Sequence, residues 1–166
     1  MCLARGLGSF CAAVAGAPVT SWDGYDTHYT ERYMGTPAAA AAAYDAASAL
    51  ATAHALRGAL MLVHGGLDEN VHWRHSARLV GALTQAGKGY ELLFFPDERH
   101  MPRGLPERLY MERRVLAFLG AQLDAPGLLF AAEEEDPAGD DPDGVEAAAA
   151  SAAERRQWVR RARFSV

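Results

Sequence analysis

The 166-residue sequence has little cysteine, no long apolar run and no excess of positive charge, and each absence excludes a class of protein. Two cysteines are too few for a disulfide framework or a zinc finger, and no apolar run approaches the about 20 residues that cross a bilayer. A formal net charge of −5 gives no electrostatic footprint for nucleic acid, and the N-terminus lacks the pattern of a signal peptide. We therefore expect a cytoplasmic protein that binds neither nucleic acid nor membrane.

The sequence has the composition of a folded protein, but its charge is unevenly distributed. Half of the residues are apolar and 22% are charged, which argues against disorder throughout the chain. Residues 125–166 carry nine acidic and five basic side chains, whereas residues 1–124 are nearly neutral. We expect a folded domain at 1–124, a disordered acidic linker at 125–146, and an Ala/Arg-rich terminal segment at 147–166 that can form a helix.

The pattern of apolar residues predicts an α/β fold. Three short apolar runs are typical of buried strands, at residues 11–19, 58–64 and 90–95. Helical spacing is found at 74–86, which Gly87 should end, and at 106–123; a weaker helix is predicted at 44–54 and an irregular or short-helical segment at 20–35. Strands that alternate with helices predict a parallel sheet covered on both faces.

An acid and a histidine follow successive predicted strands. Parallel sheets place their chemistry beyond the carboxyl ends of the strands, where Asp68 follows the second run and His100 the third. This is the order in which α/β-hydrolases present their triad acid and base. The residues alone leave open that Asp68 caps a helix and that His100 is an ordinary loop residue. His72 and His75 have no third ligand at sensible spacing, so we expect neither a metal nor a cofactor.

Three longer motifs extend this pattern into a family resemblance. They are AGAPVTSWDGYDTHYTERYMG (Ala15–Gly35), LVHGGLDENVH (Leu62–His72) and FFPDERH (Phe94–His100). Together they resemble the C-terminal part of the catalytic domain in the dipeptidyl peptidase IV branch of the prolyl oligopeptidase family, closest to the dipeptidyl peptidase 8 and 9 type. The resemblance implies the C-terminal portion of an α/β-hydrolase fold, incomplete in this chain. It also implies a serine exopeptidase that removes dipeptides from peptide N-termini after proline or alanine.

The resemblance assigns roles to individual residues. Asp68 matches the triad acid and His100 the triad base. Five residues match positions that line the proline pocket of the family: Val19, Trp22, Tyr25, Tyr29 and Val71. Asn70 and Arg32 match residues that contact the substrate carbonyl. Aromatic faces suit a rigid apolar pyrrolidine ring, although the aromatic stripe alone would read as ordinary core packing.

The nucleophile of the family is not found in this sequence. In the family it lies in a Gly-Trp-Ser-Tyr-Gly-Gly elbow, and this sequence contains no G-x-S-x-G motif. We expect a fragment that begins after the elbow and is inactive alone. Two other interpretations stay open. One is an α/β-hydrolase of other specificity, such as an esterase or acylaminoacyl peptidase. The other is a non-catalytic interaction or dimerisation module, for which the helix at 106–123 offers a surface for a partner or for a homodimer.

Overall fold

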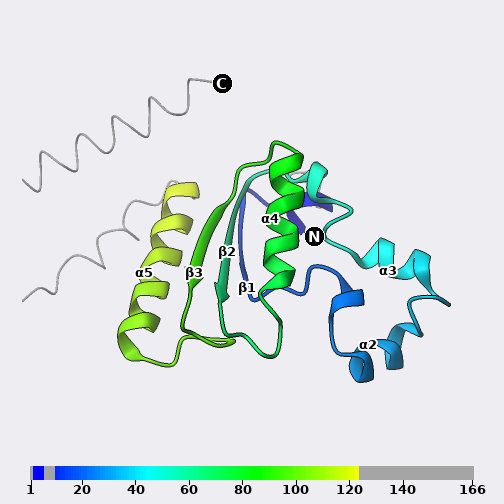
Figure 1. The fold of residues 1–166 in the computed structure, drawn as a ribbon. Helices are drawn as coiled ribbons and strands as arrows, with labels where there is room; N and C mark the ends of the chain where they lie inside the picture. Colours follow the sequence, from blue (N-terminus) through cyan, green and yellow to red (C-terminus); the bar gives the residue numbers. More distant parts are fainter. Residues whose placement is uncertain (1, 6–9, 124–166) are drawn as a thin grey trace, which may run out of the picture. The chain divides into compact units, whose positions relative to one another are not determined.

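The computed structural model describes residues 2–5 and 10–123 (Figure 1). The strands are β1 (Ala12–Gly16), β2 (Ala59–Gly65) and β3 (Glu91–Phe95). The α-helices are α1 (Cys2–Arg5), α2 (Thr27–Met34), α3 (Ala41–Ala47), α4 (Arg74–Gln85) and α5 (Leu105–Gln122), and two short 3₁₀ helices are η1 (Trp22–Gly24) and η2 (Ala53–Ala55). The predictions for residues 125–146 and 147–166 lie outside the described residues.

The three strands form one parallel sheet in the order β1-β2-β3. The register aligns Val63 of β2 with Gly16 on one side and with Leu93 on the other. The central strand β2 is a continuous apolar run, ALMLVHG, and residues 60–65 are buried, as expected for a strand covered on both faces. The predicted α/β class and the parallel sheet are confirmed.

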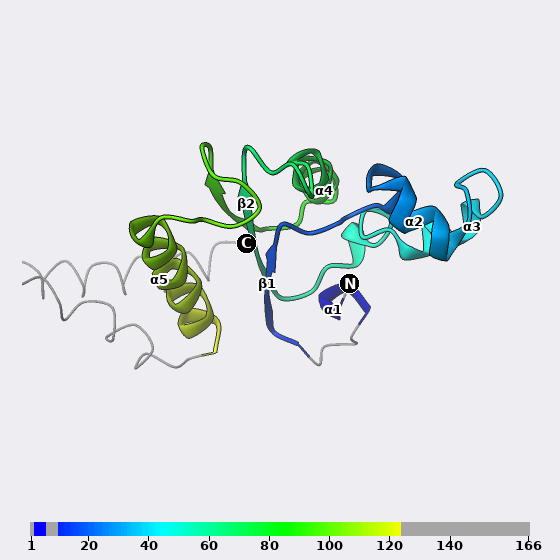
Figure 2. The same cartoon turned by 90° about the horizontal axis from the view of Figure 1, so that it is seen from below.

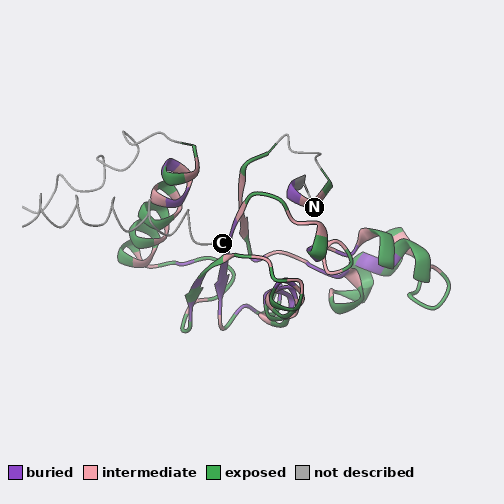
Figure 3. Ribbon diagram, turned by 90° about the horizontal axis from the view of Figure 1, so that it is seen from above, coloured by how far each residue is buried: buried purple, intermediate pink, exposed green. Residues whose placement is uncertain are grey.

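Helices cover both faces of this sheet (Figures 1 and 2). On one face, α1, η2 and α4 enclose a core with the following buried residues: Leu3, Ala53, Leu60, Leu62, Leu79 and Leu83. On the other face, Phe118 of α5 packs with Met61, Val63, Leu93 and Phe95. Figure 3 shows buried residues concentrated on β2 and on part of α4, whereas α2 and α3 are largely exposed. Among the described helices, none combines the length and apolar character needed to cross a bilayer.

Helix α4 ends as its sequence predicts. Gly87 adopts a left-handed conformation with φ of +63° and donates its N–H to the carbonyl of Thr84 at 3.1 Å. The N–H of Lys88 reaches back to the carbonyl of Leu83 at 2.9 Å. These two bonds make a Schellman motif, which satisfies carbonyls at the helix end and favours glycine at this position. The chain therefore turns sharply from α4 into β3.

The predicted helix at 44–54 is wrong in its boundaries. The structure places α3 at Ala41–Ala47, so it begins inside the alanine run, and only η2 lies in the second half of the predicted segment. Alanine is the strongest helix former, and Tyr44 anchors α3 because it is buried and donates its hydroxyl to the carbonyl of Gly35 at 2.8 Å. Ser48 ends the helix because its side chain accepts the N–H of Leu50, which favours a turn.

Candidate active site

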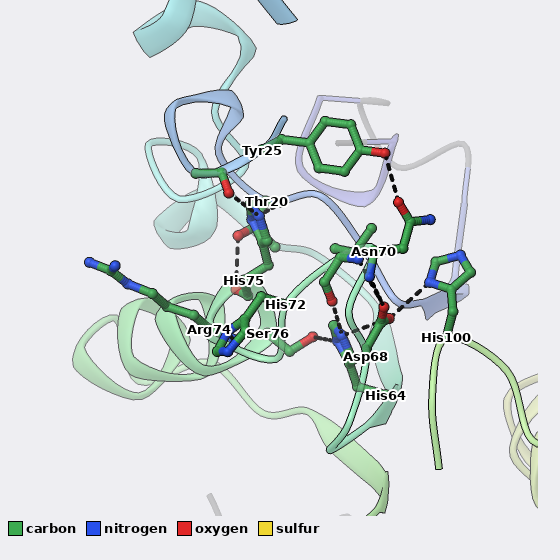
Figure 4. Close-up of polar contacts among 12 residues, drawn as sticks. Thr20, Tyr25, His64, Asp68, Asn70, His72, Arg74, His75, Ser76 and His100 are labelled. Carbon is green, nitrogen blue, oxygen red and sulfur yellow. Dashed lines mark hydrogen bonds and ion pairs between the residues drawn. The ribbon is translucent and has the colours of Figure 1, made fainter. Parts of the chain in front are cut away.

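The ends of β2 and β3 bring Asp68 and His100 into direct contact (Figure 4). The Nδ1 atom of His100 lies 2.8 Å from Oδ2 of Asp68. A carboxylate only accepts hydrogen bonds, so Nδ1 carries the proton and Nε2 of the neutral ring is left as an acceptor. Asp68 is 3% exposed, whereas the side chain of His100 is 44% exposed. The pair thus combines a buried acid with an accessible base.

The second oxygen of Asp68 organises the turn in which the residue lies. Its Oδ1 accepts the backbone N–H groups of Asn70 and Val71, each at 2.9 Å. Burial raises the pKa of Asp68, but the hydrogen bonds from His100, Val71 and Asn70 outweigh it and hold the pKa below its usual value of 3.8. Asp68 therefore stays ionised and caps its own turn; α4 begins only at Arg74.

His64 supports this turn from inside the protein. It is buried, and its Nε2 donates to the carbonyl of Val71 at 2.7 Å, because a carbonyl can only accept. Its Nδ1 then accepts the hydroxyl of Ser76 at 2.7 Å. The same Nε2 lies 3.4 Å from Oδ2 of Asp68. Hydrogen bonds inside the protein therefore hold both ring nitrogens of His64.

The loops that follow β2 and β3 are joined along their length. The N–H of Gly66 donates to the carbonyl of Phe95 at 2.8 Å, and the N–H of Leu67 to that of Glu98 at 2.9 Å. Farther along, Nη1 of Arg99 lies 2.7 Å from Oε1 of Glu69. Sequence reasoning missed this ion pair. The available signal was that opposite charges directly follow Asp68 and directly precede His100.

An aromatic cluster lies on the segment that follows β1. The Trp22 ring meets Tyr25 edge-on at 5.8 Å between centroids and stacks on Tyr29 at 6.2 Å. Tyr25 and Tyr29 meet edge-on at 5.9 Å, and Tyr33, which the prediction left out, lies 5.1 Å from Tyr29. The Tyr25 hydroxyl donates to Oδ1 of Asn70 at 3.1 Å (Figure 4). This bond connects the aromatic cluster to the turn of Asp68.

Buried His75 attaches the start of the aromatic segment to α4. Its Nδ1 accepts the N–H of Thr20 at 3.4 Å, and its Nε2 donates to the carbonyl of Gly24 at 3.1 Å. The Thr20 hydroxyl in turn donates to the His75 carbonyl at 2.8 Å. Burial lowers the pKa of His75, which favours the neutral ring that these bonds require. The described part of the chain holds no cluster of three or more side chains suited to a metal ion.

Three further predicted substrate-binding residues, Val71, Val19 and Arg32, lie in environments that differ from one another. Val71 is buried, and its backbone joins Asp68 to His64. Val19 is half-buried and lines an apolar hollow of about 270 Å³ between the sheet, α1 and α4, where its neighbours include Leu3, Leu60 and Leu79. Arg32 is exposed on α2, and its side chain makes no hydrogen bond or ion pair with the described residues. The substrate roles of all three stay predictions.

Comparison with known proteins gives one consistent family. The sequence model of the prolyl oligopeptidase family matches residues 1–126. The chain is 43% identical to dipeptidyl peptidase 8 of Homo sapiens over 117 residues, which is 69% of this chain and 13% of that protein. It is 38% identical to dipeptidyl peptidase 4 of Bos taurus over 103 residues, which is 60% of this chain and 14% of that protein.

A solved structure is similar over the same part of the chain. The crystal structure of Porphyromonas gingivalis dipeptidyl peptidase 4 superposes with a TM-score of 0.71 and 38% identity, over 72% of this chain and 17% of that one. The likeness identifies the sheet and its helices as a C-terminal portion of the α/β-hydrolase fold. The chain therefore spans less than a fifth of the length of each of these relatives.

Proposed function

The chain belongs to the prolyl oligopeptidase family, and from this premise we propose that it supplies the acid and the base of a serine dipeptidyl peptidase. Asp68 is the acid and His100 the base. The observation that carries the proposal is the 2.8 Å contact between His100 Nδ1 and the buried Asp68 carboxylate. This contact sets the ring tautomer and leaves Nε2 as the acceptor that a serine hydroxyl requires.

The reaction follows from these two atoms. Nε2 of His100 takes the proton of a serine hydroxyl as its oxygen attacks the substrate carbonyl, and later returns that proton to the leaving amine. Asp68 remains ionised because its pKa is low, and it stabilises the imidazolium that forms between these steps. The sequence contains no G-x-S-x-G motif, and the proposal assigns the serine to a segment outside this sequence. We expect the 166-residue chain alone not to cleave dipeptide amides.

The aromatic cluster is proposed as the pocket for the second substrate residue, proline or alanine. Trp22, Tyr25 and Tyr29 offer large apolar faces that lose little entropy on binding a rigid ring. The hydrogen bond between Tyr25 and Asn70 supports this role because it fixes the cluster relative to the acid turn. By the same family resemblance, Val19 and Val71 complete the pocket, and Asn70 with Arg32 contacts the substrate carbonyl.

A chimera tests the proposal directly. Residues 1–126 of this chain would replace the matching C-terminal region of human dipeptidyl peptidase 8, which keeps its own serine. We expect cleavage of a Gly-Pro amide, and we expect His100→Ala to reduce kcat on the order of 10⁴-fold. His54→Ala is the matched control, because His54 is exposed and its side chain makes no hydrogen bond or ion pair with the described residues. An inactive but folded chimera, or a His100→Ala chimera as active as its parent, would refute the proposal.

We also propose that the chain forms a homodimer through α5. Leu105, Leu109 and Leu116 are each more than 40% exposed and lie on one stripe of the helix at helical spacing. Large exposed apolar groups that share one stripe favour a partner surface. Leu109→Glu should convert dimers to monomers in sedimentation experiments, whereas Arg113→Gln on the same helix should not. A wild-type chain that sediments as a monomer at high concentration would contradict the dimer.

A further inference from the structure

A charged pair connects the two loops that carry the acid and the base. Nη1 of Arg99 lies 2.7 Å from Oε1 of Glu69, and both side chains are more than half exposed. Glu69 directly follows Asp68, and Arg99 directly precedes His100. The ion pair therefore spans the same gap as the hydrogen bond between the acid and the base, one residue away on each side.

The other hydrogen bonds between the two loops come from the backbone and lie before Asp68 and His100 in the sequence. The backbone bonds of Gly66 and Leu67 join the loops on the strand side of Asp68 and His100. The exposed His100 ring has a single hydrogen bond among the described residues, the one to Asp68. A ring held by one bond can rotate away from its acceptor unless its backbone is fixed nearby. The Glu69–Arg99 pair is the other side-chain connection across this gap in residues 10–123.

We propose that Glu69 and Arg99 are positioning residues that hold the loop of His100 against the turn of Asp68. The inference rests on the proposed roles of Asp68 and His100. The ion pair keeps Nδ1 of His100 against the carboxylate of Asp68, and this geometry directs Nε2 of the ring outward. An exposed ion pair adds little to overall stability, so its removal should change the geometry of His100 rather than the unfolding of the protein.

The charge state of Glu69 suits this role. Its own backbone N–H and the guanidinium of Arg99 both hydrogen-bond the carboxylate and lower the pKa of Glu69. The neighbouring Glu98 is engaged on the other side of the loop, where its carboxylate accepts the N–H of Arg103 at 3.2 Å. Glu69 is thus the acidic side chain that pairs with Arg99.

The test reads the ring tautomer of His100 in the full 166-residue chain. Nitrogen-15 shifts of labelled histidine, recorded at alkaline pH and assigned with a His100→Gln variant, should report the Nδ1–H form in the parent chain. Glu69→Gln and Arg99→Gln should each shift His100 toward the Nε2–H form that free imidazole prefers, with an unchanged thermal midpoint. The double variant should shift it no further than either single variant, because one interaction is lost in all three.

Two controls separate positioning from general charge effects. Arg99→Lys keeps the charge and should restore the parent tautomer, and Arg113→Gln on α5 should leave it unchanged. Parent-like spectra for Glu69→Gln and Arg99→Gln, additive shifts in the double variant, or unfolding of either single variant would overturn the proposal. The readout needs no catalysis, so it is independent of whether the chimera with dipeptidyl peptidase 8 is active.

Discussion

Asp68 accepts three hydrogen bonds although it is almost fully buried. Two come from the backbone of its own turn and the third from His100, so one carboxylate fixes both the shape of the turn and the direction of the ring. Such bonds favour the charged form and outweigh the cost of burial. The same side chain therefore links local structure to the chemistry proposed for the site.

The depressed pKa of Asp68 predicts a specific acid sensitivity. A carboxylate whose folded pKa lies below its unfolded value of 3.8 stabilises the fold above that pH, and this stability is lost as pH falls through the folded pKa. Asp68→Asn should lower the free energy of unfolding at neutral pH by about 1–3 kcal/mol. Denaturant unfolding should be measured at several pH values. Below pH 3.8, the free energy of unfolding should fall less in Asp68→Asn than in the parent chain.

The control for this experiment is Asp45→Asn on α3. Asp45 is exposed, and its side chain makes no hydrogen bond with the described residues, so its variant should follow the parent curve at every pH. Parallel curves for the parent and Asp68→Asn would contradict the prediction, because they would mean that Asp68 titrates alike in the folded and unfolded chains.

The contact between Asp68 and His100 could be predicted from the sequence, whereas the pairing of Glu69 with Arg99 could not. The carboxyl ends of neighbouring parallel strands lie side by side at one edge of the sheet. An acid and a histidine that follow two such strands are therefore brought close together. An exposed ion pair contributes little free energy, so the charges in the sequence do not by themselves select Glu69 and Arg99 as partners. Their pairing depends on the exact path of both loops, which local pattern does not determine.

At the scale of elements, the tight approach of the β2 and β3 loops depends on glycine. A Cβ atom on Gly65 would overlap the carbonyl oxygens of Arg99 and Glu98, and one on Gly66 would overlap that of Pro96. These carbonyls belong to the loop that presents His100. The two glycines therefore give the acid turn and the base loop room to contact each other.

Gly65→Ala should separate these loops. The added methyl group meets backbone rather than a flexible side chain, so we expect a loss of about 1–3 kcal/mol in the free energy of unfolding. Gly16→Ala at the end of β1 is the matched control, since its Cβ would meet nothing within 4 Å, and it should change stability by less than about 0.5 kcal/mol. Thermal or denaturant unfolding measures both, and equal stability for the two variants would contradict the model of close loop contact.

The strands and α4 agree with the sequence prediction, but α3 does not. Apolar runs such as β2 and the helical spacing of α4 reflect burial in a core, which acts over many residues at once. The boundaries of α3 depend instead on two hydrogen bonds, those made by Tyr44 and Ser48. A helix boundary that depends on a few local hydrogen bonds is not visible in the pattern of apolar residues along the sequence.

At the scale of the whole molecule, β1 is an edge strand. Among the described residues it pairs with β2 alone, and its burial is intermediate along most of its length. The carbonyl of Cys11 and the N–H of Ala17 form hydrogen bonds with β2. The backbone N–H and C=O groups of the odd-numbered residues between them therefore point toward β2, and those of the even-numbered residues point away from it. The N–H groups of Ala12 and Val14 are therefore open to another strand, which favours open-ended self-association.

Proline at the outward position should reduce this association. Ala12→Pro removes an N–H that makes no bond to β2 and lies at the first residue of the strand, where proline is tolerated. We expect slower growth of large species in light scattering with an intact fold by circular dichroism. Ala13→Pro is the contrasting variant: its N–H faces β2, so it should destabilise the sheet. If Ala12→Pro aggregates as fast as the parent chain, self-association does not proceed through the edge of β1.

The separation of the acid and the base along the chain bears on how the protein folds. Asp68 and His100 are 32 residues apart and belong to one unit of strand, helix and strand, β2–α4–β3. The entropy cost of closing a loop grows only slowly with the number of residues that it encloses, so a separation of this size is readily bridged. The contact between Asp68 and His100 therefore needs only the elements β2, α4 and β3 and the loops that follow the two strands.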